Sequence, residues 1–170
     1  TSTPINVTLV GSSIPVWMLL IGRLFFGVAI SRRQLLGAAL SISGVLLVLC
    51  RGQFEVLLQV RLVPGDLYIL VASAGWAYYS WMLARPTTEP ADIRADWSAF
   101  LLAQVAFGLA WSGLFAGGEW ALTKAHIQWG WPLSAALAFI AIGPALIAYR
   151  AWGAGVRRAG PAAAGFFSNL

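Results

Sequence analysis

Aromatic residues with a polar tip recur at helical spacing in two apolar stretches of the sequence. Trp76 and Tyr79 stand three positions apart, and Tyr149 and Trp152 repeat that spacing. Residues at i and i+3 share one face of a helix. Such a face could stack on or hydrogen-bond an amphipathic solute in a central cavity, although aromatic rings also fill volume in membrane cores. Trp76, Tyr79 and Tyr149 are therefore candidate cavity residues.

Two prolines lie inside apolar stretches, where each would break or bend a helix. Pro15 falls near the middle of one stretch, and Pro144, preceded by Gly143, falls near the middle of another. Proline lacks an N–H and clashes with the carbonyl four residues earlier, and a freed carbonyl in lipid needs another partner. We predict hinges at these positions, with Ser12 and Ser13 facing a cavity beside Pro15. The alternative is a static kink that the serine hydroxyls satisfy.

Charge inside an apolar stretch is a functional hypothesis by default. Arg23 and Arg150 each lie about 10 Å from the predicted cytoplasmic end of a helix, at 1.5 Å per residue. Their side chains could snorkel to the headgroups. If they face the bundle instead, they could form an inner gate or attract a carboxylate, because no acidic residue in the stretches is available as a partner.

Small and uncharged polar residues are predicted to hold helices together. Gly37, Ser41 and Gly44 form a stripe at helical spacing that lets two backbones approach closely. Interhelical hydrogen bonding is the default interpretation of the remaining uncharged polar residues: Asn6, Thr8, Gln104 and Asn169.

The composition excludes several kinds of chemistry. His126 is the only histidine and Cys50 the only cysteine, so CxxC redox chemistry and cysteine-based zinc sites are excluded. The net charge of +5 would indicate nucleic acid in a soluble chain, but the basic residues lie between apolar runs, where membrane topology explains them. We expect no metal, no cofactor, no catalytic residues and no nucleic acid.

Five long apolar stretches must position these residues. The sequence is 59% hydrophobic and 10% charged, against about 25% charged in ordinary soluble domains, and its mean hydropathy is +0.78. A helix needs roughly 20 apolar residues to cross a bilayer. The fold class predicted is an all-α integral membrane protein, a polytopic helical bundle. The expected spans are Ile5–Ile30, Gln34–Cys50, Gly65–Ala84, Trp97–Ala116 and Pro132–Gly153, and a sixth begins at Pro161.

Basic residues predict the orientation of these spans. By the positive-inside rule, the loops with paired arginines are cytoplasmic, namely those holding Arg32 and Arg33, Arg85 and Arg94, and Arg157 and Arg158. Tryptophans near the proposed helix ends, Trp81 and Trp97 among them, are expected at the headgroup level.

A repeat relates the first and sixth stretches. Laying Pro161 over Pro4 aligns two helix starts of small and apolar residues. Because the sixth stretch starts five helices after the first, an odd number, matching segments would face opposite sides of the membrane, as in secondary transporters with inverted repeats. We expect the chain to be part of a longer protein, with a proline two residues beyond Leu170.

The residues from Thr3 onward resemble a known family. "TPINVTLVGSSIPVWMLLIGRLFFG", followed by "SRRQLLGAALSISGVLLVL", resembles the last two helices of the first half of EamA-like transporters of the drug/metabolite transporter superfamily. "PGDLYILVASAGWAYYSWMLAR" looks like the start of their second half, and "GPALIAYRAWGAGVRRAGPAAAGFFSNL" is similar to the helix pair that leads into the Pro-containing segment of that half. The family's usual Gly-Glu pair near the end of the first of these helices is not present, because Val28 follows Gly27.

The resemblance implies ten helices in two inverted halves of five. Residues 1–52 would end the first half, 53–64 would be an outer connecting segment, and 65–170 would begin the second half. It also implies a secondary transporter in the bacterial cytoplasmic membrane that exports a small amphipathic metabolite, such as an amino acid, by alternating access. The partners would be the lipid bilayer and the solute, with protons as a candidate coupling ion. The alternatives are a membrane-embedded enzyme and a structural membrane protein without a transported solute.

Overall fold

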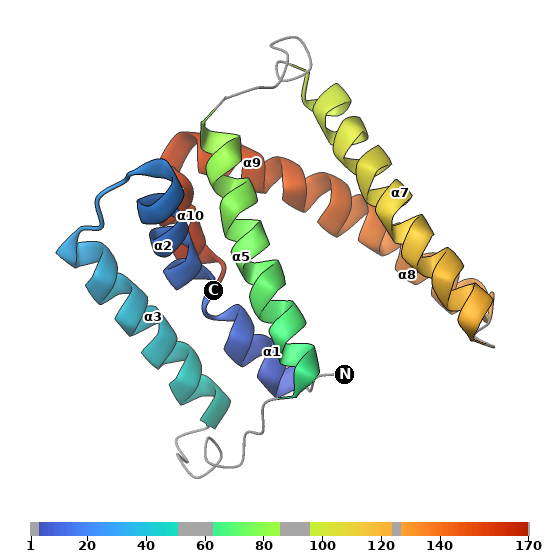
Figure 1. Ribbon diagram of the computed structural model, residues 1–170, viewed down its shortest axis with the longest axis horizontal. Helices are drawn as coiled ribbons and strands as arrows, with labels where there is room; N and C mark the ends of the chain where they lie inside the picture. The colour runs from blue at the N-terminus through green and yellow to red at the C-terminus, as the bar shows by residue number, and fades with distance from the viewer. Residues whose placement is uncertain (1–3, 51–62, 86–95, 124–126, 170) are drawn as a thin grey trace. The chain divides into compact units, whose positions relative to one another are not determined.

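The computed structural model describes residues 4–50, 63–85, 96–123 and 127–169, and every regular element within them is helical. The chain forms two compact units, residues 1–86 with 152–170, and residues 87–151. Figure 1 shows the helices of both units. Most of the predicted connecting segment 53–64 and of the loop between Arg85 and Asp96 falls outside the described residues.

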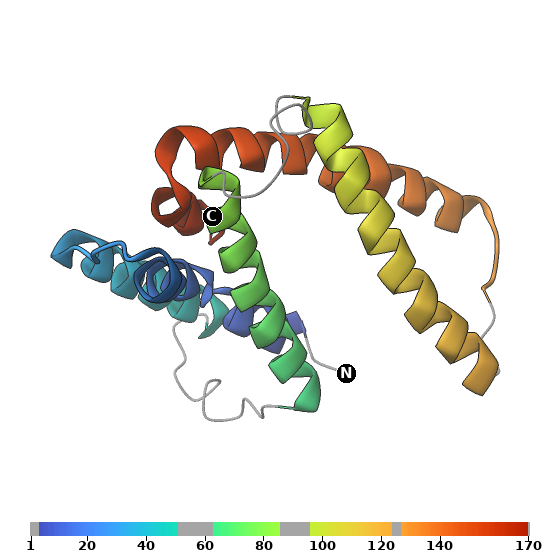
Figure 2. The same ribbon diagram turned by 45° about the horizontal axis from the view of Figure 1, so that its top comes forward.

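The first unit packs short and long helices around α2. Its helices are α1 (Pro4–Gly11), α2 (Ile14–Phe26), α3 (Arg32–Cys50), α5 (Pro64–Ala84), most of α9 (Tyr149–Ala159) and α10 (Pro161–Phe167). Both α1 and α2 contact α3 on one side and α5 on the other, as Figures 1 and 2 show. α10 contacts α2, α3 and α5.

The core of this unit forms between α2 and α5. Met18, Ile21, Ala77 and Trp81 are buried there together. The indole Nε1 of Trp81 donates a hydrogen bond of 2.7 Å to the carbonyl of Met18. Trp81, which the sequence predicts at the headgroup level, is therefore buried between two helices, and its N–H has a partner inside the unit.

The second unit consists of long helices with exposed apolar surfaces. It contains α7 (Trp97–Leu122), α8 (Trp131–Ile140), the π-helix η1 (Ala141–Ala148) and the first residues of α9. Asp96 caps α7 by accepting hydrogen bonds from the backbone N–H groups of Ser98 and Ala99. Phe107 and Phe115 are more than 70% exposed. A helix that is apolar on all faces suits a lipid environment.

The lengths of the helices confirm a multi-pass membrane chain. Four helical segments are long and apolar enough to cross a bilayer: Ile5–Phe26, Arg32–Cys50, Trp97–Leu122 and Trp131–Ala159. α5, the third expected span, has 21 residues but is not among these four. Its serines, tyrosines and Asp66 lower its hydropathy, and several of them are buried against the neighbouring helices.

The first expected span differs from the prediction in its continuity and in its end. It is divided into α1 and α2, and it ends at Phe26 rather than at Ile30. Gly27 adopts a left-handed conformation with φ of 65°, which glycine reaches without steric cost. Its N–H and that of Val28 both bond to the carbonyl of Gly22, so the helix is closed at this point.

The second span begins at Arg32, two residues before the predicted start. The N–H of Ser31 donates to the side-chain oxygen of Gln34 at 2.8 Å, and the N–H of Gln34 donates to the Ser31 hydroxyl at 3.2 Å. This reciprocal pair is a capping box. Arg32 and Arg33 therefore lie in the first turn of α3 rather than in a loop.

Two later spans are longer than predicted. α7 continues past Ala116 to Leu122. Gly117 and Gly118 do not end the helix, because a backbone in lipid must form its hydrogen bonds within the helix. The fifth span continues past Gly153 to Ala159, which places Arg157 and Arg158 in the last turn of α9. α5 begins one residue early, at Pro64, and the predicted start of α10 at Pro161 is confirmed.

Candidate functional site

The break between α1 and α2 lies two residues before Pro15. Pro15 occupies the second position of α2, where its missing N–H costs no helical hydrogen bond. The hydroxyl of Ser12 donates to the carbonyl of Leu9 and that of Ser13 to the carbonyl of Val10, each at 2.6 Å. These bonds satisfy carbonyls at the end of α1, as a static kink requires. The hydroxyls of Ser12 and Ser13 are thus used within their own chain segment.

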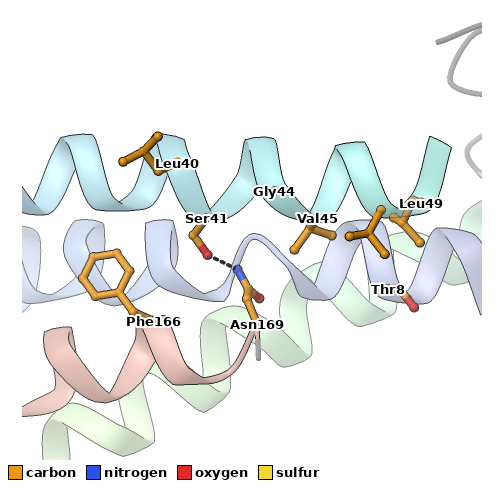
Figure 3. A pocket seen from close by; sticks show the side chains of 9 residues that line it. Thr8, Leu40, Ser41, Gly44, Val45, Leu49, Phe166 and Asn169 are labelled. Atoms are coloured by element: carbon orange, nitrogen blue, oxygen red, sulfur yellow. Dashed lines mark hydrogen bonds between the residues drawn. The ribbon is translucent and has the colours of Figure 1, made fainter. Parts of the chain in front are cut away.

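A turn that follows α10 lies close to this break. This helix ends at Phe167, and the hydroxyl of Ser168 donates to the carbonyl of Gly165 at 2.6 Å. Asn169 lies in the turn that follows, and its side-chain amide Nδ2 donates to the Ser12 carbonyl at 3.1 Å and to the Ser41 hydroxyl at 2.9 Å. One side chain therefore joins the turn after α10 to the α1–α2 break and to α3, as Figure 3 shows for the bond to Ser41.

Glycine allows α10 to lie against the broken helix. A Cβ on Gly165 would lie 2.6 Å from Met18 Cγ and 3.6 Å from the Cα of Pro15. A Cβ on Gly37 would lie 3.5 Å from the ring of Phe166, so the predicted packing stripe on α3 contacts α10 at this point. The close approach packs the end of α10 against α2 at Pro15 and Met18.

A pocket of about 440 Å³ opens between α1, α3 and α10 (Figure 3). Ser41 and Gly44 from the predicted stripe line it, together with Asn169. None of the five residues predicted to line a cavity does: Ser12, Ser13, Trp76, Tyr79 and Tyr149. The pocket thus brings together residues for which the sequence favoured only helix packing.

The aromatic face of α5 is packed against α9. The ring of Trp76 lies 5.5 Å from that of Tyr79 and 5.3 Å from that of Trp152, centroid to centroid. The indole of Trp152 donates to the Ser80 hydroxyl at 3.1 Å, and that hydroxyl donates to the Trp76 carbonyl. Trp76 and Tyr79 are partly buried, so this aromatic cluster both fills space and retains exposed ring surface.

The arginines lie on exposed positions. Arg23 is exposed in the last turn of α2. Arg150 is exposed, and its guanidinium lies 5.1 Å from the centre of the Trp97 ring at the start of α7, within the second unit. Arg85 donates to the carbonyl of Phe26 at 3.1 Å and lies over its ring, a favourable position for a cation at the end of α2.

Gly143 and Pro144 lie inside the π-helix η1 rather than at a break. The wider turns of η1 extend from Ala141 to Ala148. π-helical turns place each hydrogen bond one residue further along and are frequent at functional sites. The chain thus keeps its helical path around a residue that has no N–H to donate.

Sequence reasoning missed the role of a buried acidic side chain, Asp66. The expectation that no acidic residue in the apolar stretches is available as a partner is wrong here, because Asp66 is the second residue of the stretch Gly65–Ala84. Its Oδ2 accepts a hydrogen bond from Asn6 Nδ2 at 2.7 Å and another from the Val63 N–H at 2.8 Å. Both Asp66 and Asn6 are about 95% buried. The available signal was the position of Asp66 in the first turn of a helix after Pro64, where a carboxyl group caps the backbone.

The chain is distantly similar to a curated protein. The chain is 25% identical over 170 residues to the "Uncharacterized transporter YyaM" of Bacillus subtilis (strain 168), and the match covers 99% of the chain and 53% of that protein. The chain thus spans about half the length of the curated relative it matches. No protein-family model matches the sequence, and no solved structure matches it significantly. The chain is therefore a multi-pass helical membrane protein with sequence similarity to a transporter.

Proposed function

We propose that this chain belongs to a secondary transporter of the EamA-like kind, which exports a small amphipathic metabolite, such as an amino acid, by alternating access. The observation that carries the proposal is the interruption between α1 and α2, where the side chain of Asn169, which follows α10, donates a hydrogen bond to the Ser12 carbonyl. Interrupted helices are typical of the solute-binding regions of secondary transporters. The similarity to a named transporter supports the same class.

The likeness of α1 and α10 supports an inverted repeat. α1 has eight residues from Pro4, and α10 has seven residues from Pro161. In each case a serine follows the helix and its hydroxyl donates to the carbonyl three residues earlier. In our proposal these helices are equivalent members of two five-helix halves, in a ten-helix protein of the bacterial cytoplasmic membrane.

Transport by the purified protein tests the proposal directly. Reconstituted into liposomes, the protein should catalyse counterflow of at least one amphipathic metabolite, and a pH gradient should drive uptake if protons are the coupling ion. If the protein transports no member of a broad panel of metabolites, the proposal is wrong, and an enzyme or a structural protein is favoured.

Trp76→Ala and Tyr79→Ala should each lower the transport rate at least about fivefold, while insertion into the membrane stays unchanged. Each substitution removes a ring from a partly exposed aromatic face, and stacked aromatic contacts contribute about 1 kcal/mol each. Initial rates in liposomes, normalised to the reconstituted protein, measure the effect. Tyr68→Ala, on an exposed part of the same helix α5, is the control. Unchanged rates in both variants would exclude this face from the solute path.

Pro144→Ala should slow transport several-fold if η1 acts as a hinge. Alanine restores an N–H and favours regular α-helix over the wider turns, so the helix would become harder to bend. The control is Pro132→Ala in the first turn of α8, where a proline removes no helical hydrogen bond. Full activity of Pro144→Ala would instead favour a static distortion.

A further inference from the structure

Asp66 is a buried ionisable side chain in a membrane chain, and the function proposed above gives it no role. Asp66 and its partner Asn6 are each about 95% buried. Asp66 is also the one acidic residue in the described part of the first unit. Ionisable residues in membrane segments are costly, and they commonly belong to ion or proton pathways. Asp66 is therefore a candidate for binding a proton.

The bond between Asn6 and Asp66 suits an ionised carboxylate. Asn6 Nδ2 donates to Asp66 Oδ2 at 2.7 Å, and the backbone N–H of Val63 donates to the same oxygen at 2.8 Å. Hydrogen bonds to an ionised acceptor are shorter than neutral ones and roughly twice as strong. The two N–H donors favour the ionised form, whereas burial disfavours it. A proton on Asp66 would therefore weaken a bond that the carboxylate makes well.

The other charged groups of the described helices around α5 lie far from Asp66. Neither α1, which packs on this end of α5, nor α10 has a titratable side chain. Arg23 and Arg85 lie near the other end of α5, more than about 20 Å away at 1.5 Å per residue, and α9 crosses that end too (Figure 1). Tyr68, two residues after Asp66, is 76% exposed. Among these helices, the Asn6 bond is thus the contact that a proton on Asp66 changes first.

The position of α1 depends on contacts with other helices. α1 has eight residues, and isolated helices shorter than about 12–15 residues are only marginally stable. The break before α2 separates it from the rest of the span, so α1 can shift without bending a continuous helix. The side chain of Asn6, in the first turn of α1, ties it to α5 across 60 positions of sequence. A weaker bond to Asp66 would therefore loosen α1 before it loosens α2, which Trp81 holds to α5.

We propose that Asp66 binds a proton and that this proton loosens α1 from α5, so that pH regulates the movement of the interrupted helix. The inference rests on the transport function proposed above, and it names a regulator of that function. The proton comes from water and adds to the carboxylate, which becomes a neutral acid, and no other covalent bond changes. In the orientation predicted from the paired arginines, the first turn of α5 lies at the outer face, where the external pH would act on it.

Hydrogen exchange at neutral and acid pH tests whether Asp66 controls α1 in the purified protein in lipid nanodiscs. Each exchange rate is divided by the intrinsic rate of that amide at the same pH. On acidification, the protection of α1 amides should fall at least about fivefold, as expected when a charge-assisted hydrogen bond becomes a neutral one, and that of α2 should not change. Asp66→Asn cannot ionise and should give the same low protection of α1 at both pH values. Unchanged protection of α1 in the native protein, or an equal response in Asp66→Asn, would overturn the proposal.

Infrared difference spectra detect the proton itself, and matched variants separate proton binding from the tie to α1. A component of the C=O stretch of protonated carboxyl groups should appear on acidification and be lost in Asp66→Asn. Asn6→Ala keeps the acid, so it should retain this component while the protection of α1 is low at both pH values; it also carries the test if Asp66→Asn fails to fold. Asp96→Asn alters an exposed helix cap in the other unit and should keep the native response of α1. Identical spectra of Asp66→Asn and the native protein would overturn the proposal.

Counterflow assays separate failure of this proposal from failure of the proposed function. If the native protein transports a solute, its rate should rise at least about threefold on acidification, because α1 moves more freely once the bond is weaker, and Asp66→Asn should show one rate at both pH values. Counterflow in a protein whose α1 does not respond to pH would overturn the role of Asp66 and leave the transport function intact. A response of α1 through Asp66 in a protein that moves no solute would support the proton site and contradict the transport function.

Discussion

Gly22→Ala is expected to lower the free energy of unfolding by about 2–4 kcal/mol, because it forces Trp81 out of its place in the core. A Cβ on Gly22 would overlap the Trp81 ring, with Cε2 only 2.7 Å away. The ring is rigid and buried, and its N–H is bonded to the Met18 carbonyl, so it cannot move aside without losing that bond. Unfolding by sodium dodecyl sulfate in mixed micelles, followed by tryptophan fluorescence, measures the change.

Matched glycines separate this clash from the general effect of adding a methyl group. Gly44 and Gly75 lie in helices and have no atom within 4 Å of a built Cβ. Alanine at either position should be neutral or stabilise the helix by about 0.5–1 kcal/mol, through its greater helix propensity. In a Trp81→Phe background, the cost of Gly22→Ala should fall by more than half, because the overlapping atoms of the larger ring are gone. Additive effects of the two substitutions would show that the clash is not with Trp81.

Features that depend on neighbouring residues could be predicted from the sequence. Long apolar runs predicted the helices, Pro15 predicted an interruption, and Pro161 predicted the start of α10. The ends of helices depend on caps and on the backbone conformation of single residues, which the pattern of apolar residues does not show. The Ser31 and Gln34 capping box starts α3 early, and the positive φ of Gly27 stops α2 early. The Ser31–Gln34 spacing and Gly27 are both visible in the sequence, but a prediction based on the number of apolar residues does not use them.

Features that depend on packing could not be predicted. Ser41 and Gly44 form the same small-residue stripe whether they contact another helix or line a pocket, and only the position of α10 decides which. Asn169 lies 157 positions from Ser12 in the sequence, so their bond exists only because Gly165 lets α10 approach Pro15. Tryptophan is enriched at membrane interfaces, but Gly22, which faces Trp81, leaves room for the Trp81 ring in the core.

Asp66→Ala should destabilise the protein by about 2–4 kcal/mol, well above the effect of an ordinary helix cap. The substitution removes the acceptor that Asn6 and the Val63 N–H share on Oδ2. Both side chains are about 95% buried, where water replaces a lost acceptor poorly. The pair also ties α1 to α5 across 60 positions of sequence. Asp66→Asn, which keeps an oxygen in place, should lose less than half as much.

Asp96→Ala is the control, because Asp96 also caps a helix with its carboxyl group but is exposed. It should cost about 1 kcal/mol, as is typical of an exposed cap. Hydrogen exchange then shows where each loss falls: amides of α1 should exchange faster in Asp66→Ala, since α1 loses its bond to α5, and should be unchanged in Asp96→Ala. Equal stability losses in the two variants, with α1 protected in both, would mean that Asp66 only caps α5. In that case the packing of Gly165 against Pro15 and Met18, rather than the Asn6–Asp66 pair, would hold the interrupted helix in place.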